Sequence, residues 1–204
     1  MSSAHWVATN AESTTPMQMF KRHDTQLNTQ PLLDALAAHP ELWNAITVRQ
    51  DYPGSAHHDT QCVFLRGPYE FNPESYMGTI DAHDYGAMTL LGGVITDLLR
   101  PTLYDMRVTE LGYVLIVRLP PGGMIDEHID EGVYADHYAR FHVALTDSPK
   151  ASLTVGGETQ HFAQGDVWEF NHKQPHSGSN MGSAPRIHLI FDAVVPHPLV
   201  HVPA

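Results

Sequence analysis

A histidine and an aspartate stand two residues apart after a Pro/Gly turn, in the segment LPPGGMIDEHID, where they are His128 and Asp130. Side chains two residues apart in extended backbone point to the same side, so this pair could bind one metal ion. A second histidine, His176, follows the segment GDVWEFNHKQP. Two imidazoles and one carboxylate form the facial triad of non-heme Fe(II) oxygenases. We therefore predict His128, Asp130 and His176 as metal ligands.

An arginine further along the chain suits a co-substrate of this triad. Three protein ligands leave three positions of an octahedron open, which a 2-oxo acid and dioxygen can fill. The far carboxylate of 2-oxoglutarate would then need a cation, and Arg186 lies on a predicted strand ten residues after His176. An arginine matches a carboxylate with two parallel hydrogen bonds.

The segment RFHVAL supports the same interpretation by its alternation. Arg140, His142 and Ala144 fall on one strand face, and Phe141, Val143 and Leu145 fall on the other. This pattern suits a barrel whose interior holds a polar ligand. We expect Arg140 and His142 to reach the co-substrate or the substrate.

The elements that must position these residues are helical first and extended later. Apolar spacing predicts helices over 30–39 and 85–99, and strands over 46–49 and 61–66. From residue 111 onward, short segments punctuated by Gly and Pro predict strands at 111–118, 138–146, 151–155, 159–163, 166–171 and 185–194. This order predicts a mainly β fold, a β-sandwich or jelly roll with the helices on one side.

Length and composition restrict the class of protein. The 204 residues suit one domain, 1–204, with a polar lead-in segment at 1–25 and a Pro-rich tail at 196–204. Eleven Lys and Arg against 23 Asp and Glu disfavour a partner as anionic as long nucleic acid. The single cysteine, Cys62, excludes a disulfide scaffold or a Cys-rich metal site and reads as a core thiol. With no apolar run long enough for a membrane and no targeting signal, we expect a cytoplasmic protein.

Four segments, RLPPGGMIDEHID, RFHVAL, GDVWEFNHKQPHSGSN and PRIHLIFD, together resemble the aspartyl/asparaginyl β-hydroxylase family of 2-oxoglutarate dioxygenases. That family includes bacterial proline cis-hydroxylases, and the resemblance covers about 111–195, with a weaker match at HHDTQCVFLRG, 57–67. It implies a double-stranded β-helix, the jelly-roll or cupin barrel. It also implies that His128, Asp130 and His176 hold Fe(II), that Arg186 binds the C5 carboxylate of 2-oxoglutarate, and that His142 contacts its metal-bound end. Arg140 would line the site.

One departure from the family pattern bears on the substrate. The animal aspartyl hydroxylases lack the carboxylate ligand, whereas Asp130 completes the triad here. The chain therefore looks closer to the bacterial branch that acts on small molecules. We expect hydroxylation of an unactivated C–H bond in an amino acid or peptide residue with a carboxylate, consuming dioxygen and releasing succinate and CO2.

Candidate substrate residues are less specific. Arg140 or Arg66 could hold the substrate carboxylate, although Arg66 could equally be an ordinary surface arginine. The segment 124–137 is expected to be a loop that closes over the site and brings Tyr134 and His137 to the substrate. The histidines of the run 57–59 could form a second metal site, but a polar loop is the interpretation we favour.

Three other functions remain open from the sequence. The same chemistry could act on a protein, lipid or nucleotide. A cupin metalloenzyme independent of 2-oxoglutarate is a second alternative, although it would need no arginine at 186 and usually has a third histidine where Asp130 stands. A non-catalytic barrel that serves as a binding module is the third, although it would not need to keep all three ligands.

Overall fold

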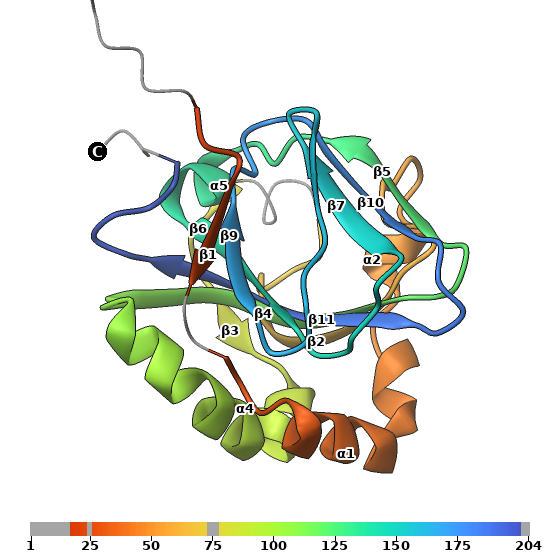
Figure 1. Cartoon of the computed structure of the whole chain (residues 1–204). Helices are drawn as coiled ribbons and strands as arrows, with labels where there is room; N and C mark the ends of the chain where they lie inside the picture. The colour runs from red at the N-terminus through yellow and green to blue at the C-terminus, as the bar shows by residue number, and fades with distance from the viewer. Residues whose placement is uncertain (1–16, 24–25, 73–77, 201–204) are drawn as a thin grey trace, which may run out of the picture.

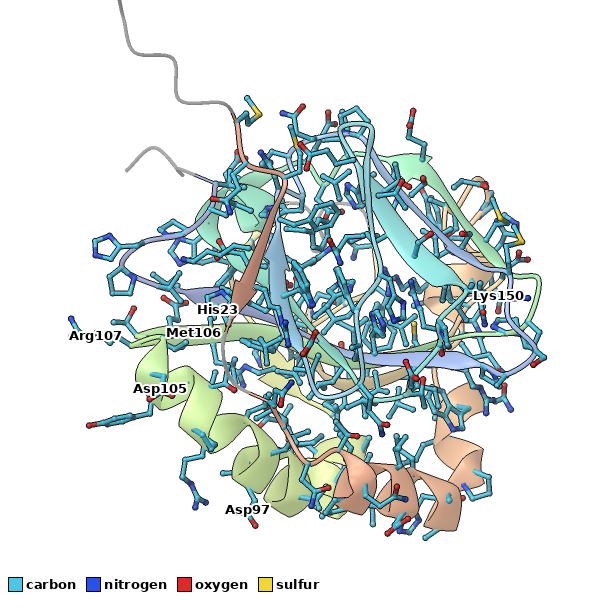
Figure 2. All side chains as sticks on the ribbon, viewed as in Figure 1. His23, Asp97, Asp105, Met106, Arg107 and Lys150 are labelled. Carbon is cyan, nitrogen blue, oxygen red and sulfur yellow. The ribbon has the colours of Figure 1, made fainter. Side chains whose placement is uncertain are left out.

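Two antiparallel sheets face each other in the structure, a computed structural model that describes residues 17–23, 26–72 and 78–200 (Figure 1). The seven-stranded sheet has the order β1-β9-β6-β11-β4-β2-β3, and the four-stranded sheet has the order β5-β10-β7-β8. The strands are β1 Phe20–His23, β2 Gln61–Gly67, β3 His83–Asp84, β4 Glu110–Leu119, β5 Met124–His128, β6 Ala139–Ala144, β7 Ala151–Val155, β8 Glu158–Gln160, β9 Val167–Phe170, β10 His176–Asn180 and β11 Arg186–Val194. The helices are α1 Gln30–Ala38, η1 Pro40–Asn44, α2 Val48–Asp51, α4 Gly86–Asp105 and α5 Val133–His137. This is the predicted jelly-roll barrel, and side chains fill the space between its sheets (Figure 2).

The two longest helices, α1 and α4, cover the outer face of the large sheet. α1 and α4 pack against each other and lie beneath β2, β4 and β11 (Figure 1). The apolar stripe of α4 that the sequence predicts is buried at Leu91, Ile95, Leu98 and Leu99. These residues join the outward side chains of the sheet, such as Ile116, Phe141 and Leu189, in one hydrophobic core. The predicted helices on one side of the barrel are therefore confirmed.

Alternation along the central strands assigns each residue to one of two faces. On β4, Val114 and Ile116 point into the core between the large sheet and the helices. Tyr113, Leu115 and Val117 belong to a second apolar cluster inside the barrel. Because strand side chains alternate, one short segment can build the core and line the interior at once.

Several predicted boundaries need correction. Residues 46–49 do not form a strand: α2 begins at Val48, and the Thr47 carbonyl accepts hydrogen bonds from the backbone of Gln50 and Asp51. The run is too short for its β-branched residues to outweigh this local turn. α4 extends past 99 through Pro101, and the fully buried Thr102 anchors its last turn.

The two ends of the chain are also more structured than expected. Within the lead-in segment 1–25, Phe20–His23 form β1, which pairs with β9; residues 1–16 and 24–25 lie outside the described part. Residues 196–200 of the Pro-rich tail lie at the surface, and the backbone N–H of Leu199 donates to the buried carboxylate of Glu169; residues 201–204 are not described. None of the helices within the described residues has the length and apolarity to cross a membrane.

Candidate active site

The three predicted metal ligands meet at one end of the small sheet. His128 ends β5, His176 begins β10, and the two residues are paired across these antiparallel strands. One donor atom from each of His128, Asp130 and His176 lies within 4.8 Å of the others. The Asp130 carboxylate is 3.8 Å from Nε2 of His128 and 3.9 Å from Nε2 of His176. The sequence places His176 beyond a strand end, but in the structure a new strand begins there.

Backbone carbonyls orient both imidazoles. Nδ1 of His128 lies 2.8 Å from the Asp126 carbonyl, and Nδ1 of His176 lies 2.9 Å from the Gln174 carbonyl. Because a carbonyl can only accept, each Nδ1 must carry the proton and donate it. The lone pair of each Nε2 is therefore left to face Asp130, as a metal-ligating histidine requires. Asp130 is itself held by its backbone N–H, which donates to the His172 carbonyl at 3.1 Å.

The protonation states suit a divalent cation. Burial lowers the pKa of His176 to about 4 and also lowers the pKa of His128. Burial raises the pKa of Asp130, but the charges of Arg140 and of nearby histidines outweigh it and bring the value to about 2. At neutral pH the cluster thus offers two neutral imidazoles and one carboxylate, the forms that bind metal. Nitrogen and oxygen donors of this kind fit Fe(II).

Arg140 ties the triad to a second buried carboxylate, Asp192 on β11. Its Nη1 donates to Asp130 at 2.6 Å, while Nε and Nη2 donate to the two oxygens of Asp192 at 2.8 and 2.9 Å. Asp192 also accepts the hydroxyl proton of Tyr134 at 3.1 Å, and that hydroxyl accepts the backbone N–H of Tyr113 at 2.5 Å. Arg140 therefore contacts the candidate ligand Asp130 and shares its charge between two acidic residues, while its contact with a co-substrate or substrate stays a prediction.

Arg186 lies deeper in the barrel, and no acidic residue in the described part of the chain pairs with it. It is 2% exposed, and among the described residues its Nε and Nη1 have no hydrogen-bond partner. Gly178 packs closely beside it, because a Cβ there would already be in contact with Nη1 at 3.4 Å. Burial lowers the pKa of Arg186 to about 10, which still leaves it charged at neutral pH. A buried guanidinium without a hydrogen-bond partner at Nε and Nη1 can bind the carboxylate of a ligand.

Two neutral histidines lie beside this guanidinium. Nδ1 of His142 lies 3.3 Å from Nδ1 of His188, and both rings are buried. Burial, and then the Arg186 charge, hold the pKa of both well below the usual value. The His142 ring packs against Phe170, and Phe170 also packs against the ring of His176. The side chains that line a small pocket at Arg186 and His188 include Ser152, Leu153 and Phe162. The predicted inward face of β6 is thus confirmed, although the ligands of His142 stay a prediction.

Arg66 does not join this cluster in the structure. Its Nη1 donates to Asp84 on β3 at 2.8 Å, and its Nε donates to the Leu111 carbonyl at 3.3 Å. An exposed acidic residue therefore already neutralises Arg66, as expected of an ordinary surface arginine.

The expected closing loop at 124–137 is also wrong, because this segment forms β5 and α5. Tyr134 is 4% exposed, and its ring stacks on Tyr113 with 3.7 Å between centroids. It supports Asp192 from behind and is not available to a substrate. His137 ends α5 and faces Glu110 at 3.3 Å. Tyr134 is buried because Gly112 on β4 leaves space for its hydroxyl.

Two further residues, His57 and Arg49, border the triad. The sequence singles out His57 only within the run 57–59 and does not single out Arg49. The His57 ring packs edge-on against His128, with 4.7 Å between centroids. Arg49 on α2 lies behind His57, with Nη2 3.0 Å from its Nε2. The 57–59 run is therefore a polar loop, as favoured, but a loop that touches the site. The spacing of residues in the sequence does not predict that Arg49 lies near the metal ligands.

Comparisons with solved structures show the fold. An oxidoreductase of the 2OG-Fe(II) oxygenase family from Burkholderia pseudomallei aligns with a TM-score of 0.51 and 14% identity, over 90% of this chain and 97% of that chain. The cupin domain of Cnp3 from Schizosaccharomyces pombe aligns with a TM-score of 0.34 and 17% identity, over 40% of this chain and 55% of that domain. The match therefore spans only about half of the cupin domain.

Sequence comparison places the chain in a family. Among curated proteins, none matches this sequence significantly. The family model described as aspartyl/asparaginyl beta-hydroxylase matches residues 93–196, half of the chain. The matched stretch runs from within α4 to just past β11, so it contains His128, Asp130, His176 and Arg186. The chain therefore belongs to the aspartyl/asparaginyl β-hydroxylase family.

Proposed function

We propose that this protein is an Fe(II)- and 2-oxoglutarate-dependent dioxygenase. Its substrate would be an amino acid or a peptide residue that carries a carboxylate, and one C–H bond would be hydroxylated with release of succinate and CO2. The observation that carries the proposal is the combination of the His128, Asp130 and His176 cluster with the unpaired, buried Arg186. The resemblance in fold to a protein named as a 2OG-Fe(II) oxygenase supports it.

Each residue of the site has a distinct part in this proposal. His128, Asp130 and His176 would hold the metal, and Fe(II) would supply the activation of dioxygen that attack on an unreactive C–H bond requires. Arg186 would bind the far carboxylate of 2-oxoglutarate with its free Nε and Nη1. His142 and His188, both neutral, would border the co-substrate without competing for its charge. Arg140 would fix the orientation of Asp130.

The buried guanidinium also argues against the alternatives. A cupin metalloenzyme that uses no 2-oxo acid would gain nothing from Arg186, whose charge is costly in a closed interior. The same holds for a barrel that only binds a partner through its surface. A buried cation without a counterion is retained most simply when an anionic ligand completes it.

An anaerobic titration with Fe(II) and 2-oxoglutarate tests the proposal directly. The wild-type protein should develop the visible metal-to-ligand charge-transfer absorption, and His176→Ala should not. His39→Ala is the matched control, because His39 lies at the end of α1 and its side chain pairs with the exposed Glu41. The absence of this absorption in the wild type, or undiminished succinate production by His176→Ala, would refute the proposal.

A further inference from the structure

Arg49 is a second guanidinium at the metal centre for which the described residues supply no acid. Its Nη2 contacts the His57 ring, its Nη1 donates to the sulfur of Cys62 at 3.7 Å, and its Nε is buried without a hydrogen-bond partner. A thiol sulfur is a weak acceptor, so none of these contacts balances the positive charge. The described part of the chain contains no ion pair to Arg49.

The surrounding loop fixes Arg49 and His57 in place. The Ser55 hydroxyl donates to the Arg49 carbonyl at 2.5 Å and accepts the backbone N–H of His57 at 3.1 Å. The loop is also attached to β5, because the backbone N–H of Asp126 donates to the Ala56 carbonyl at 2.9 Å. The strand that carries His128 therefore also determines where Arg49 lies.

The charges of the site show what kind of ligand is missing. Arg140 is already paired with both Asp130 and Asp192. If the proposed function holds, one carboxylate of 2-oxoglutarate coordinates the metal and the other binds Arg186. Neither the described residues nor the co-substrate therefore supply an anion for Arg49, and the organic ligand that remains is the substrate.

Resting on that proposed function, we propose that Arg49, supported by His57, binds the carboxylate of the substrate beside the metal centre. The wall next to Arg49 is apolar, because Cys62 packs with Phe64, Leu115 and Val117 inside the barrel. A substrate held there by its carboxylate would lay its carbon chain along this wall. Arg49 thus becomes the residue that selects an acid over an uncharged analogue, a part that the sequence had given to Arg66 or Arg140.

Calorimetric binding to protein loaded with Zn(II), which supports no turnover, tests this assignment. The probes are the common L-amino acids, their N-acetyl derivatives and, for each acid that binds, its carboxamide. The wild type should bind at least one acid and bind its carboxamide at least tenfold more weakly. Arg49→Gln should weaken binding of the acid by roughly 10- to 100-fold, the effect of losing one charged hydrogen bond. Arg49→Lys should recover part of the loss.

Affinity for 2-oxoglutarate separates the two proposals. It should be unchanged in Arg49→Gln and in Arg100→Gln, a control on the exposed face of α4. Two results in Arg49→Gln would each overturn the assignment: unchanged binding of the acid, or a loss of 2-oxoglutarate affinity. Two results in the wild type would do the same: equal binding of acid and carboxamide, or no binding of any acid. If the wild type fails to bind 2-oxoglutarate at all, the proposed function is wrong, while the comparison of acid with carboxamide still decides whether Arg49 binds an anion.

Discussion

Replacing Arg186 with methionine should stabilise the ligand-free protein and at the same time abolish 2-oxoglutarate binding. Most changes to buried residues destabilise, so the sign of this effect is diagnostic. The effect follows from the burial of the guanidinium, which is 2% exposed. Among the described residues its Nε and Nη1 have no hydrogen-bond partner and no carboxylate pairs with it. Methionine keeps the unbranched aliphatic part of the side chain and removes the charge.

The magnitude follows from the pKa of Arg186, which burial lowers from 12.5 to about 10. One pKa unit corresponds to about 1.4 kcal/mol, so the charged side chain costs the folded state about 3 kcal/mol. Because the folded pKa is the lower one, this cost is present at all pH values below about 10. The shorter methionine leaves a small cavity worth about 1 to 2 kcal/mol. The free energy of unfolding should therefore rise by about 1 to 2 kcal/mol.

Urea unfolding with a metal chelator present measures the first effect. The thermal shift on adding 2-oxoglutarate to Zn(II)-loaded protein measures the second, which should disappear in Arg186→Met. Arg118→Met is the matched control, because Arg118 donates to Gln61 and lies 4.3 Å over the Trp43 ring, so its loss should destabilise. A loss of more than about 1 kcal/mol in Arg186→Met would show that the guanidinium makes favourable contacts within the protein. The interpretation of Arg186 as an anion site would then be wrong.

Three further predictions concern stability and metal binding. The pKa of His176 in the folded protein is about 4, below its usual 6.5, so the free energy of unfolding of the metal-free wild type should fall by about 3 kcal/mol as the pH falls from 6.5 to 4. In urea unfolding at these two pH values, His176→Gln should lose correspondingly less; an equal loss would contradict this assignment. Gly112→Ala should cost about 1 to 3 kcal/mol in urea unfolding, because its Cβ would lie 2.4 Å from the Tyr134 hydroxyl; unchanged stability would contradict this packing. Asp192→Asn should lower Zn(II) affinity about tenfold in a chelator competition, because Arg140 would then bind the metal ligand Asp130 alone; wild-type affinity would refute that coupling.

The parts of the fold with apolar periodicity could be predicted from the sequence. α1, β4 and β11 lie within one residue of their expected ranges, and α4 begins within one residue of its expected start, because each buries a regular set of large apolar side chains. β10 could not be predicted, since the run HSGSN has no apolar alternation. It exists because β5 and β7 pair with it on both sides, and such pairing depends on residues far away in the sequence.

The candidate site shows the same division. The His-x-Asp spacing brought Asp130 near His128, and the ten-residue spacing correctly placed Arg186 in the barrel. Tyr134 was misjudged because its burial depends on a glycine opposite it on β4. Arg49 reaches the site through a loop that is hydrogen-bonded to β5. This contact joins residues far apart in the sequence, so it could not be predicted from local sequence patterns.

β11 explains how one barrel tolerates so many buried polar groups. Its inward positions, at every second residue, hold Arg186, His188, Ile190 and Asp192, while Leu189 and Phe191 point outward into the core between the sheet and the helices. Asp192 could therefore have been found by counting in steps of two from Arg186. The outward side chains, packed against α1 and α4, stabilise the strand, so the inward ones are free to carry charge at a cost in stability. Substitutions at the inward positions should therefore change ligand binding more than folding, and substitutions at the outward positions should do the reverse.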